Sequence, residues 1–320
     1  MIPEGLEILA LPVLIIGVLL LWKGSDILID GTSKTAVHLG ISALIVSVIL
    51  VGFGTSAPEF AISVGAAAQN NSDISLGNII GSCVANLMLV LGVAAIIRPI
   101  KIKKRIVKRE FPIMLGATIV LLVSSFLGLL DSYRWIGGVL FLVLFASFVG
   151  YFVICARKER DSRKKIDTGK TSKNLFFIVL GIIGVIVGAL LLIESAVTIA
   201  EVLQINPFII AISMVAIGTS VPELMVSSMA SYKKESDIAI GNVLGSNVFN
   251  ILLILGFAAF FIPLKAIDFL PHLWILLAVS LVMFPILYTG NIISRKKGAF
   301  MLVIYSVFIW YSFFGYTLFS

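Results

Sequence analysis

The chain has 320 residues, of which 59% are hydrophobic and only 13% are charged. Water-soluble domains carry about 25% charged residues, and a fold in water could not hide this much apolar surface. The composition therefore excludes a soluble protein, and it predicts that the lipid bilayer is the solvent for most of the chain.

Ten stretches are apolar and long enough to cross the bilayer, because a crossing helix needs roughly 20 mostly apolar residues. Helices are expected because every backbone N–H and C=O must be bonded within lipid. The first stretch is interpreted as a retained helix and not a cleaved signal peptide, since Glu4 and Glu7 precede it in place of a basic segment. The stretches are residues 8–29, 41–66, 75–97, 111–130, 135–155, 175–200, 207–230, 238–262, 270–289 and 299–319.

The basic residues indicate how these stretches are oriented. With ten crossings, 21 of the 24 lysines and arginines fall in loops on one side of the membrane. Cytoplasmic loops carry the Lys/Arg excess, so both termini are expected outside the cell, with the chain in the plasma membrane. The net charge of +7 is accordingly attributed to topology and anionic lipid, not to nucleic acid. The basic groups are Lys34 and residues 98–109, 157–173, 233–234 and 295–297.

The sequence contains an internal duplication. When it is shifted by 164 residues, residues 41–100 align with 205–264 without a gap, and 25 of 60 pairs are identical. Each half then holds five helices, and an odd number makes the second copy enter the membrane from the opposite side. We therefore expect an all-α membrane fold of two inverted five-helix repeats, residues 1–155 and 175–320, joined by a basic cytoplasmic linker, 156–174.

Two of the stretches contain signals for a break. GTSAPE at 54–59 aligns with GTSVPE at 218–223, so Pro58 and Pro222 both lie inside apolar segments. Proline removes a backbone donor and clashes with the preceding turn, which would free carbonyls near residues 52–55 and 216–219. Substrate sites of inverted-repeat transporters lie at such discontinuous helices, and we expect helices 2, 3, 7 and 8 to be discontinuous.

Glu59 and Glu223 follow these breaks and lie near the middle of their helices. A charged side chain at that depth is costly and marks function by default. Threonine and serine precede each glutamate by four and three residues, on the same helix face. A second polar stripe is expected on helices 3 and 8, formed by Asn78, Ser82 and Asn86 and by Asn242, Ser246 and Asn250.

These candidate ligands are all oxygens, which suit calcium or sodium, whereas zinc or copper would need His or Cys. Cys83 is expected to pack in a helix, since Asn247 replaces it in the second repeat. Two carboxylates are neutralised by one divalent ion, by two monovalent ions or by two protons. Ions that compete for one alternating site are exchanged, so antiport is predicted.

At these motifs the chain resembles the calcium:cation antiporter superfamily, which includes the sodium/calcium exchangers. G-T-S-x-P-E and G-N-x-x-G-S-x-x-x-N each occur twice. The resemblance implies calcium exchanged for sodium, with no resident cofactor and a functional monomer, and it implies that helices 1 and 6 slide to switch access. The implied ligands are Thr55, Ser56, Glu59, Ser82 and Asn86, then Thr219, Ser220, Glu223, Ser246 and Asn250, with the Ala216 carbonyl and its mate at Gly52.

One departure leaves the coupling ion open. Several sodium/calcium exchangers have Asp at the position of Asn250, so this site has two acids instead of three. The proton-coupled branch usually has G-N-A-P-E or G-N-A-V-E, and Thr55 and Thr219 favour the sodium type over a calcium/proton antiporter. A channel is disfavoured because pores are usually ringed by identical subunits. An enzyme is disfavoured because catalytic motifs such as H-E-x-x-H are absent from the sequence.

Overall fold

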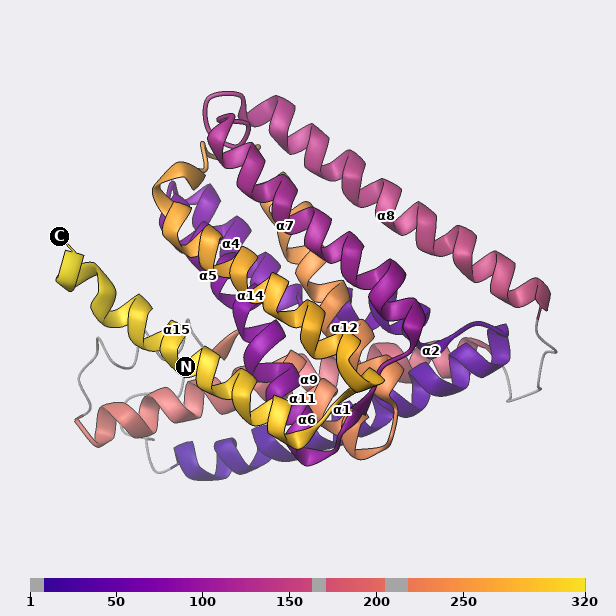
Figure 1. Cartoon of the computed structure of the whole chain (residues 1–320). Coiled ribbons are helices and arrows are strands. Elements are labelled where there is room, and N and C mark those ends of the chain that lie inside the picture. The colour runs from indigo at the N-terminus through magenta and orange to yellow at the C-terminus, as the bar shows by residue number, and fades with distance from the viewer. Residues whose placement is uncertain (1–8, 163–170, 205–217, 320) are drawn as a thin grey trace.

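The computed structural model describes residues 9–162, 171–204 and 218–319, which are almost entirely helical (Figure 1). In the first half, α1 is a long helix that ends at Gly40, whose left-handed backbone (φ 68°) turns the chain. The elements are α1 (Ala10–Leu39), α2 (Ala43–Val46), η2 (Ser47–Val51), α3 (Gly52–Thr55), α4 (Ala57–Ala68), α5 (Ser72–Ala85), η3 (Asn86–Val90), α6 (Leu91–Ile97), β1 (Ile100–Lys101), η4 (Ile106–Glu110), α7 (Phe111–Phe126) and α8 (Arg134–Ser162).

The second half has a similar order of elements, although the start of its broken helix lies outside the described residues. The elements are α9 (Thr171–Val202), α11 (Val221–Tyr232), α12 (Ser236–Val248), η6 (Phe249–Ile254), α13 (Leu255–Ala258), η7 (Ala266–Phe269), α14 (Leu270–Tyr288), η8 (Thr289–Asn291), β2 (Ile292–Ile293) and α15 (Arg295–Phe319).

Six of the described helices are long and apolar enough to cross a bilayer, and one bent pair counts as a seventh. Each of the ten predicted stretches overlaps a helix, except that residues 207–217 of the seventh stretch lie outside the described ranges. The prediction of a helical membrane protein is therefore confirmed.

The predicted break at the first proline is present. The helices Ala43–Thr55 and Ala57–Ala68 meet at an angle of 47°. Ser56 stands between them with φ −82° and ψ 7°, and Pro58 occupies the first turn of α4, where the missing N–H costs no helical hydrogen bond. Ser220 has nearly the same backbone (φ −88°, ψ 5°) before Pro222 of α11, so the local geometry is repeated.

Helices 3 and 8 were also expected to be discontinuous, and this expectation was wrong. Residues Ser72–Ile97 and Ser236–Ala258 each form one continuous helix. Each contains a wider π-helical segment, η3 or η6, beginning at or next to the last residue of its polar stripe. A π-segment re-registers side chains while backbone groups remain bonded, and neither helix contains a proline that would force a break.

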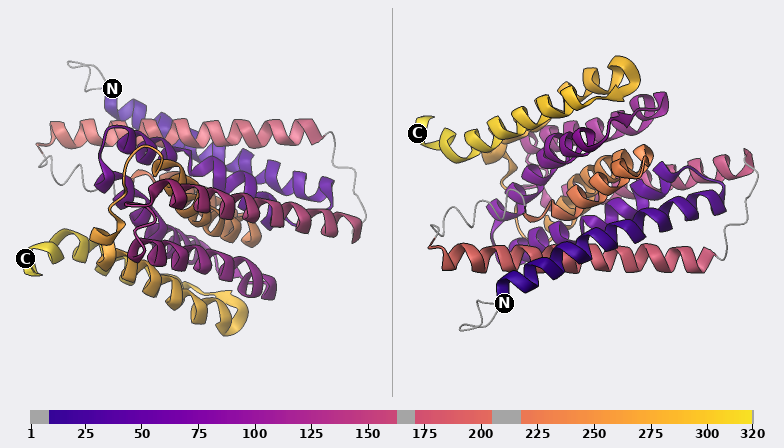
Figure 2. Two further views of the ribbon diagram at one scale, coloured as in Figure 1. Left: turned by 90° about the horizontal axis from the view of Figure 1, so that it is seen from above. Right: turned by 90° about the horizontal axis from the view of Figure 1, so that it is seen from below.

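Helices α1 and α9 form a closely packed pair along one flank of the molecule, and α15 lies on the opposite flank (Figure 2). Glycines permit this approach: a methyl group added at Gly24 would lie 2.8 Å from the backbone nitrogen of Val185, and one at Gly188 would lie 2.6 Å from that of Leu21. The predicted glycine-rich faces of these two helices are therefore in direct contact.

The loops that carry the basic groups contact one another at one end of the bundle. Strands β1 and β2 pair antiparallel and join the loop after α6 to the loop after α14. Arg98 donates to the carbonyl of Tyr232 at 3.2 Å, and Arg105 forms an ion pair with Glu159. The backbone N–H of Ser42 also donates to Glu159 at 2.8 Å. Loops that the sequence placed on one side therefore meet in space.

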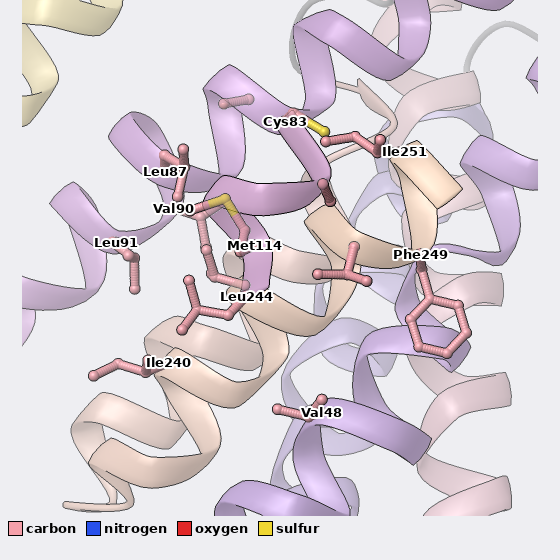
Figure 3. Close-up of a cluster of buried hydrophobic side chains, with 14 of the residues drawn as sticks. Val48, Cys83, Leu87, Val90, Leu91, Met114, Ile240, Leu244, Phe249 and Ile251 are labelled. Atoms are coloured by element: carbon pink, nitrogen blue, oxygen red, sulfur yellow. The ribbon is translucent and has the colours of Figure 1, made fainter. Parts of the chain in front are cut away.

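The apolar core fills the centre between the two halves. Leu87, Met114 and Leu244 lie within it, and all three are fully or almost fully buried. Cys83 is fully buried close to Ile251 (Figure 3), with its thiol 4.0 Å from the carbonyl of Asn247. This environment agrees with the prediction that Cys83 is a packing residue.

Candidate ion-binding site

Glu59 and Glu223 occupy equivalent positions in the two halves. Each lies in the first turn of its helix, α4 or α11, and neither side chain has any exposed surface. The start of a helix carries a partial positive charge, which favours an ionised carboxylate there. The starts of both helices therefore lie inside the protein, and each carries a carboxylate.

An asparagine holds each of these helices in the same way. Asn78 donates to the backbone carbonyl of Glu59 at 3.4 Å and to Ser63 at 2.8 Å. Asn242 donates to the backbone carbonyl of Glu223 at 3.5 Å and to Ser227 at 3.0 Å. The sequence duplication is thus reproduced in hydrogen bonds that fix the broken helices against α5 and α12.

The carboxylates are also bonded alike by serines of their own repeat. Ser82 donates to Oε1 of Glu59 at 3.1 Å, and Ser246 donates to Oε1 of Glu223 at 3.4 Å. Each serine lies 23 residues after its glutamate. The second polar stripe, predicted on helices 3 and 8, therefore faces the glutamates.

Further contacts connect the two repeats. Ser56 donates to Oε1 of Glu223 at 3.3 Å, and Ser220 donates to Ser82 at 3.3 Å. The amide nitrogen of Asn250 also donates to Ser82, at 3.2 Å. Glu223 is therefore bonded directly by a serine of the first half, and residues of the second half reach Glu59 through Ser82, as expected for a site at a repeat interface.

The Gly52–Thr55 segment closes another side of the site. The carbonyl of Gly52 accepts from Ser246 at 3.2 Å, and Thr55 donates to the amide oxygen of Asn242 at 3.0 Å. Thr219, the mate of Thr55, is buried. Ala216, the predicted mate of Gly52, lies outside the described residues.

Five buried oxygens of the glutamates and the polar stripes have no hydrogen-bond donor among the described residues: Oε2 of Glu59, Oε2 of Glu223, and Oδ1 of Asn78, Asn86 and Asn250. A buried polar atom without a partner costs about 1–3 kcal/mol, and more when it is charged. Several such acceptors gathered around two carboxylates are the arrangement that a bound cation would satisfy.

The chemistry of the candidate ligand atoms restricts which cation the site can bind. Within the described residues, no group of three or more Asp, Glu, His or Cys side chains gathers as a metal site. The further ligands available to Glu59 and Glu223 are therefore neutral hydroxyl, amide and carbonyl oxygens, which suit hard ions such as Ca²⁺ and Na⁺. A small crevice of about 130 Å³ between Phe53, Phe60 and Phe249 reaches Ser56 at the edge of the site.

Most of the predicted residues are connected in this network, and three further residues belong to it. Asn86 is buried and donates to Asn247 at 3.1 Å, which in turn donates to the carbonyl of Cys83. Sequence reasoning missed Asn247 as a site neighbour, together with Ser63 and Ser227. The two serines are identical in the aligned repeats and lie four residues after the glutamates, so the duplication itself could have identified them.

The sodium/calcium exchanger protein family matches residues 9–154 and 173–314 of the chain. The chain belongs to this family. Sodium/calcium exchanger MaX1 from Methanosarcina acetivorans is 32% identical over 337 residues, covering 93% of this chain and 96% of MaX1. The inner membrane protein YrbG of Escherichia coli is 32% identical over 266 residues, covering 80% of this chain and 81% of YrbG.

The fold matches the sodium-calcium exchanger NCX_Mj, solved after soaking with Na⁺ and Sr²⁺, with a TM-score of 0.83 and 33% identity. The match covers 95% of this chain and 98% of NCX_Mj. The resemblance inferred from the repeated motifs is therefore confirmed at the level of the family, and two of these relatives, MaX1 and NCX_Mj, are sodium/calcium exchangers by name.

Proposed function

We propose that this exchanger moves calcium against sodium by alternating access, at a site built from Glu59 and Glu223. The observation that carries the proposal is the group of buried oxygens without donors, two on the glutamates and three on Asn78, Asn86 and Asn250. On this basis and by the resemblance, we assign as ligands the ten side chains predicted from the sequence, and in addition the backbone carbonyls of Gly52 and Ala216.

Alternating access is supported by the burial of the site. Both glutamates are completely buried and Ser82 and Ser220 are at most 3% exposed, so an ion held there would be shut off from both sides. Release requires one part of the protein to move relative to another. The α1–α9 pair is the part suited to move, since its two helices pack more closely with each other than with the broken helices.

The orientation of the chain is part of this proposal. The contacts among the basic loops place them on one face, which we assign to the cytoplasm of a plasma-membrane protein. All the proposed ligands belong to one chain, so we propose that a monomer is the functional unit.

Calcium uptake into liposomes, with sodium and pH gradients imposed separately, tests the function. Uptake driven by internal sodium is expected for the wild type, and Glu59→Gln and Glu223→Gln are expected to lower it at least about 100-fold, because each removes a charge on which ion binding depends. Ser72→Ala, at a half-buried position at the start of α5, is the control. Wild-type rates in both glutamine variants would overturn the site.

Calcium/proton exchange is the second candidate, and Asn250 favours it. With an amide at this position the site has two acids, whose charge two protons would neutralise as well as one Ca²⁺. Calcium uptake driven by a pH gradient in the complete absence of sodium would establish proton coupling. Calcium uptake with neither a sodium gradient nor a pH gradient imposed would indicate a channel.

A further inference from the structure

A groove runs between the α1–α9 pair and the neighbouring elements α2, η2 and α8, at the end of the molecule where the basic loops meet. Its volume is about 290 Å³. Apolar side chains such as Ile45, Ile49 and Val153 form most of its lining, and the charged side chains among the described lining residues are Arg157 and Arg160 of α8.

The dimensions of the groove correspond to one leaflet of a bilayer. Along α8 the lining extends from Val153 to Arg160, a distance of about 10 Å at 1.5 Å per residue. The hydrocarbon of one leaflet is about 15 Å deep, half of a core of about 30 Å. In the proposed orientation, with the arginines at the level of the lipid headgroups, the apolar part of the groove lies among the acyl chains.

Among the described residues, no acidic side chain neutralises the charge at the arginine end of the groove. Arg157 and Arg160 are exposed and three residues apart, on one side of the helix. Within the described ranges neither forms an ion pair or a hydrogen bond. Glu159 is engaged elsewhere, with the N–H of Ser42 and with Arg105, and none of the described residues that line the groove is acidic.

A second groove, between α7 and α8, shows how a neutralised site differs. It is larger, about 560 Å³, and has Lys108 and Arg109 at its end. Arg109 forms an ion pair with the buried Glu110, so a carboxylate already balances one of the two charges. In the groove beside α1, two positive charges remain without a carboxylate among the described residues, against one in the second groove.

We propose that the groove between the α1–α9 pair and the elements α2, η2 and α8 binds an anionic phospholipid of the cytoplasmic leaflet. The phosphate lies on Arg157 and Arg160, and an acyl chain lies along Ile45, Ile49 and Val153. Guanidinium groups match phosphate in geometry as well as charge. A neutral lipid fills the same apolar walls but leaves both arginines without a counter-charge. This proposal rests on the membrane orientation proposed above.

The position of the lipid gives it a means to influence transport. One wall of the groove contains Thr35 and Leu39 of α1 and Leu175 of α9, and the other contains residues of η2 and α8. A lipid in the groove contacts both the helix pair proposed to move and the part proposed to remain still. It therefore stabilises the arrangement of the two parts in which the groove is open.

Photo-crosslinking of lipids to the full chain in bilayers tests the proposal. Phosphatidylglycerol and phosphatidylcholine are compared, each with a diazirine on the same acyl chain, and mass spectrometry locates the labelled peptides. Phosphatidylglycerol is expected to label residues 41–50 and 153–160 roughly 25-fold more than phosphatidylcholine, since each of the two arginines near anionic lipid contributes about a fivefold gain in binding. Arg157→Gln with Arg160→Gln is expected to abolish this preference.

Lys104→Gln with Lys296→Gln removes the same charge from exposed positions outside the groove and is expected to keep the preference. Ala156→Trp, which fills the groove without changing its charge, is expected to reduce labelling by both lipids. Equal labelling by the two lipids, or a preference that survives loss of both arginines, would overturn the proposal, as would full competition by tail-less glycerophosphoglycerol. Glu59→Gln should leave the labelling unchanged, so failure of the transport site is distinguishable from failure of the lipid site.

Discussion

Asn250 determines both the charge and the hydrogen bonding of the candidate site. Its amide nitrogen donates to Ser82, which itself donates to Glu59, and its amide oxygen has no donor among the described residues. A carboxylate at this position would replace the N–H donor with a third negative charge. The residue thus controls how much positive charge the site must take up before it is neutral.

Replacing Asn250 with Asp is expected to strengthen calcium binding at pH 8 by at least about tenfold, because an added carboxylate ligand raises affinity for a divalent cation. The gain should shrink towards pH 5, where a buried carboxyl group takes up a proton in place of the ion. Calcium titrations followed by calorimetry at both pH values measure the effect.

The matched control is Asn71→Asp, which adds the same charge at the N-cap of α5, where Asp and Asn serve equally well. It should leave calcium affinity unchanged. An unaltered affinity in the Asn250 variant, beside a normal control, would mean that residue 250 does not face the ion.

At the scale of elements, the sequence predicts some features of the site and not others. Proline at residue 58 specifies a break through its missing N–H, and the structure has a 47° bend there. The π-helical segments η3 and η6 could not be foreseen, because no single residue type requires this hydrogen-bond pattern. The predicted stripes are nevertheless correct, since a spacing of four residues places Asn78 and Ser82 on one face of the helix before the π-segment begins.

An ionic contact also joins the α1–α9 pair to the rest of the protein. Lys233, in the loop between α11 and α12, pairs with Asp26 and, at 2.7 Å, with Asp30 of α1. Its partial burial alone would lower the pKa of Lys233, but the hydrogen bonds to the two aspartates outweigh this and raise it. The contact is therefore complete at neutral pH. It is lost as the pH rises above the ordinary lysine range, near 10.4, and again at acid pH, where the aspartates take up protons.

Lys233→Gln is expected to release α1 from this loop. A partly exposed ion pair is worth up to about 1 kcal/mol, so the balance between the two access states should shift by about fivefold or less. Faster amide hydrogen exchange in residues 26–33 and a changed half-saturation for calcium are the measurements.

Lys23→Gln is the control for this change, since Lys23 pairs with Asp26 within α1 and does not reach the loop. The aligned position in the first repeat is Gln69, so the ion pair belongs to one half only and should favour one access state. Equal effects of the two lysine variants would contradict a specific role for Lys233.

At the scale of the molecule, the repeat and the distribution of charge lead to the same arrangement. The basic loops near Arg98, Arg105 and Glu159 contact one another at one end. Elsewhere, Leu264 donates its N–H to the carbonyl of Leu130 at 2.7 Å, and Arg134 donates to Ala259. These contacts join the loops after α7 and α13, which the sequence placed on the other side. A chain that crosses the membrane alternately in each direction accounts for both groups of loop contacts, and it is compatible with either group facing the cytoplasm.

Cysteine labelling in intact cells determines that orientation. In a Cys155→Ser background, where the remaining Cys83 is fully buried, Ser132→Cys is expected to react with a membrane-impermeant maleimide added outside. Lys104→Cys should react only after the membrane is permeabilised, because loops rich in Lys and Arg stay in the cytoplasm. The reverse pattern would invert the molecule, and it would move the lipid groove beside Arg157 to the outer leaflet. Labelling of both positions from outside would contradict the alternating crossings themselves.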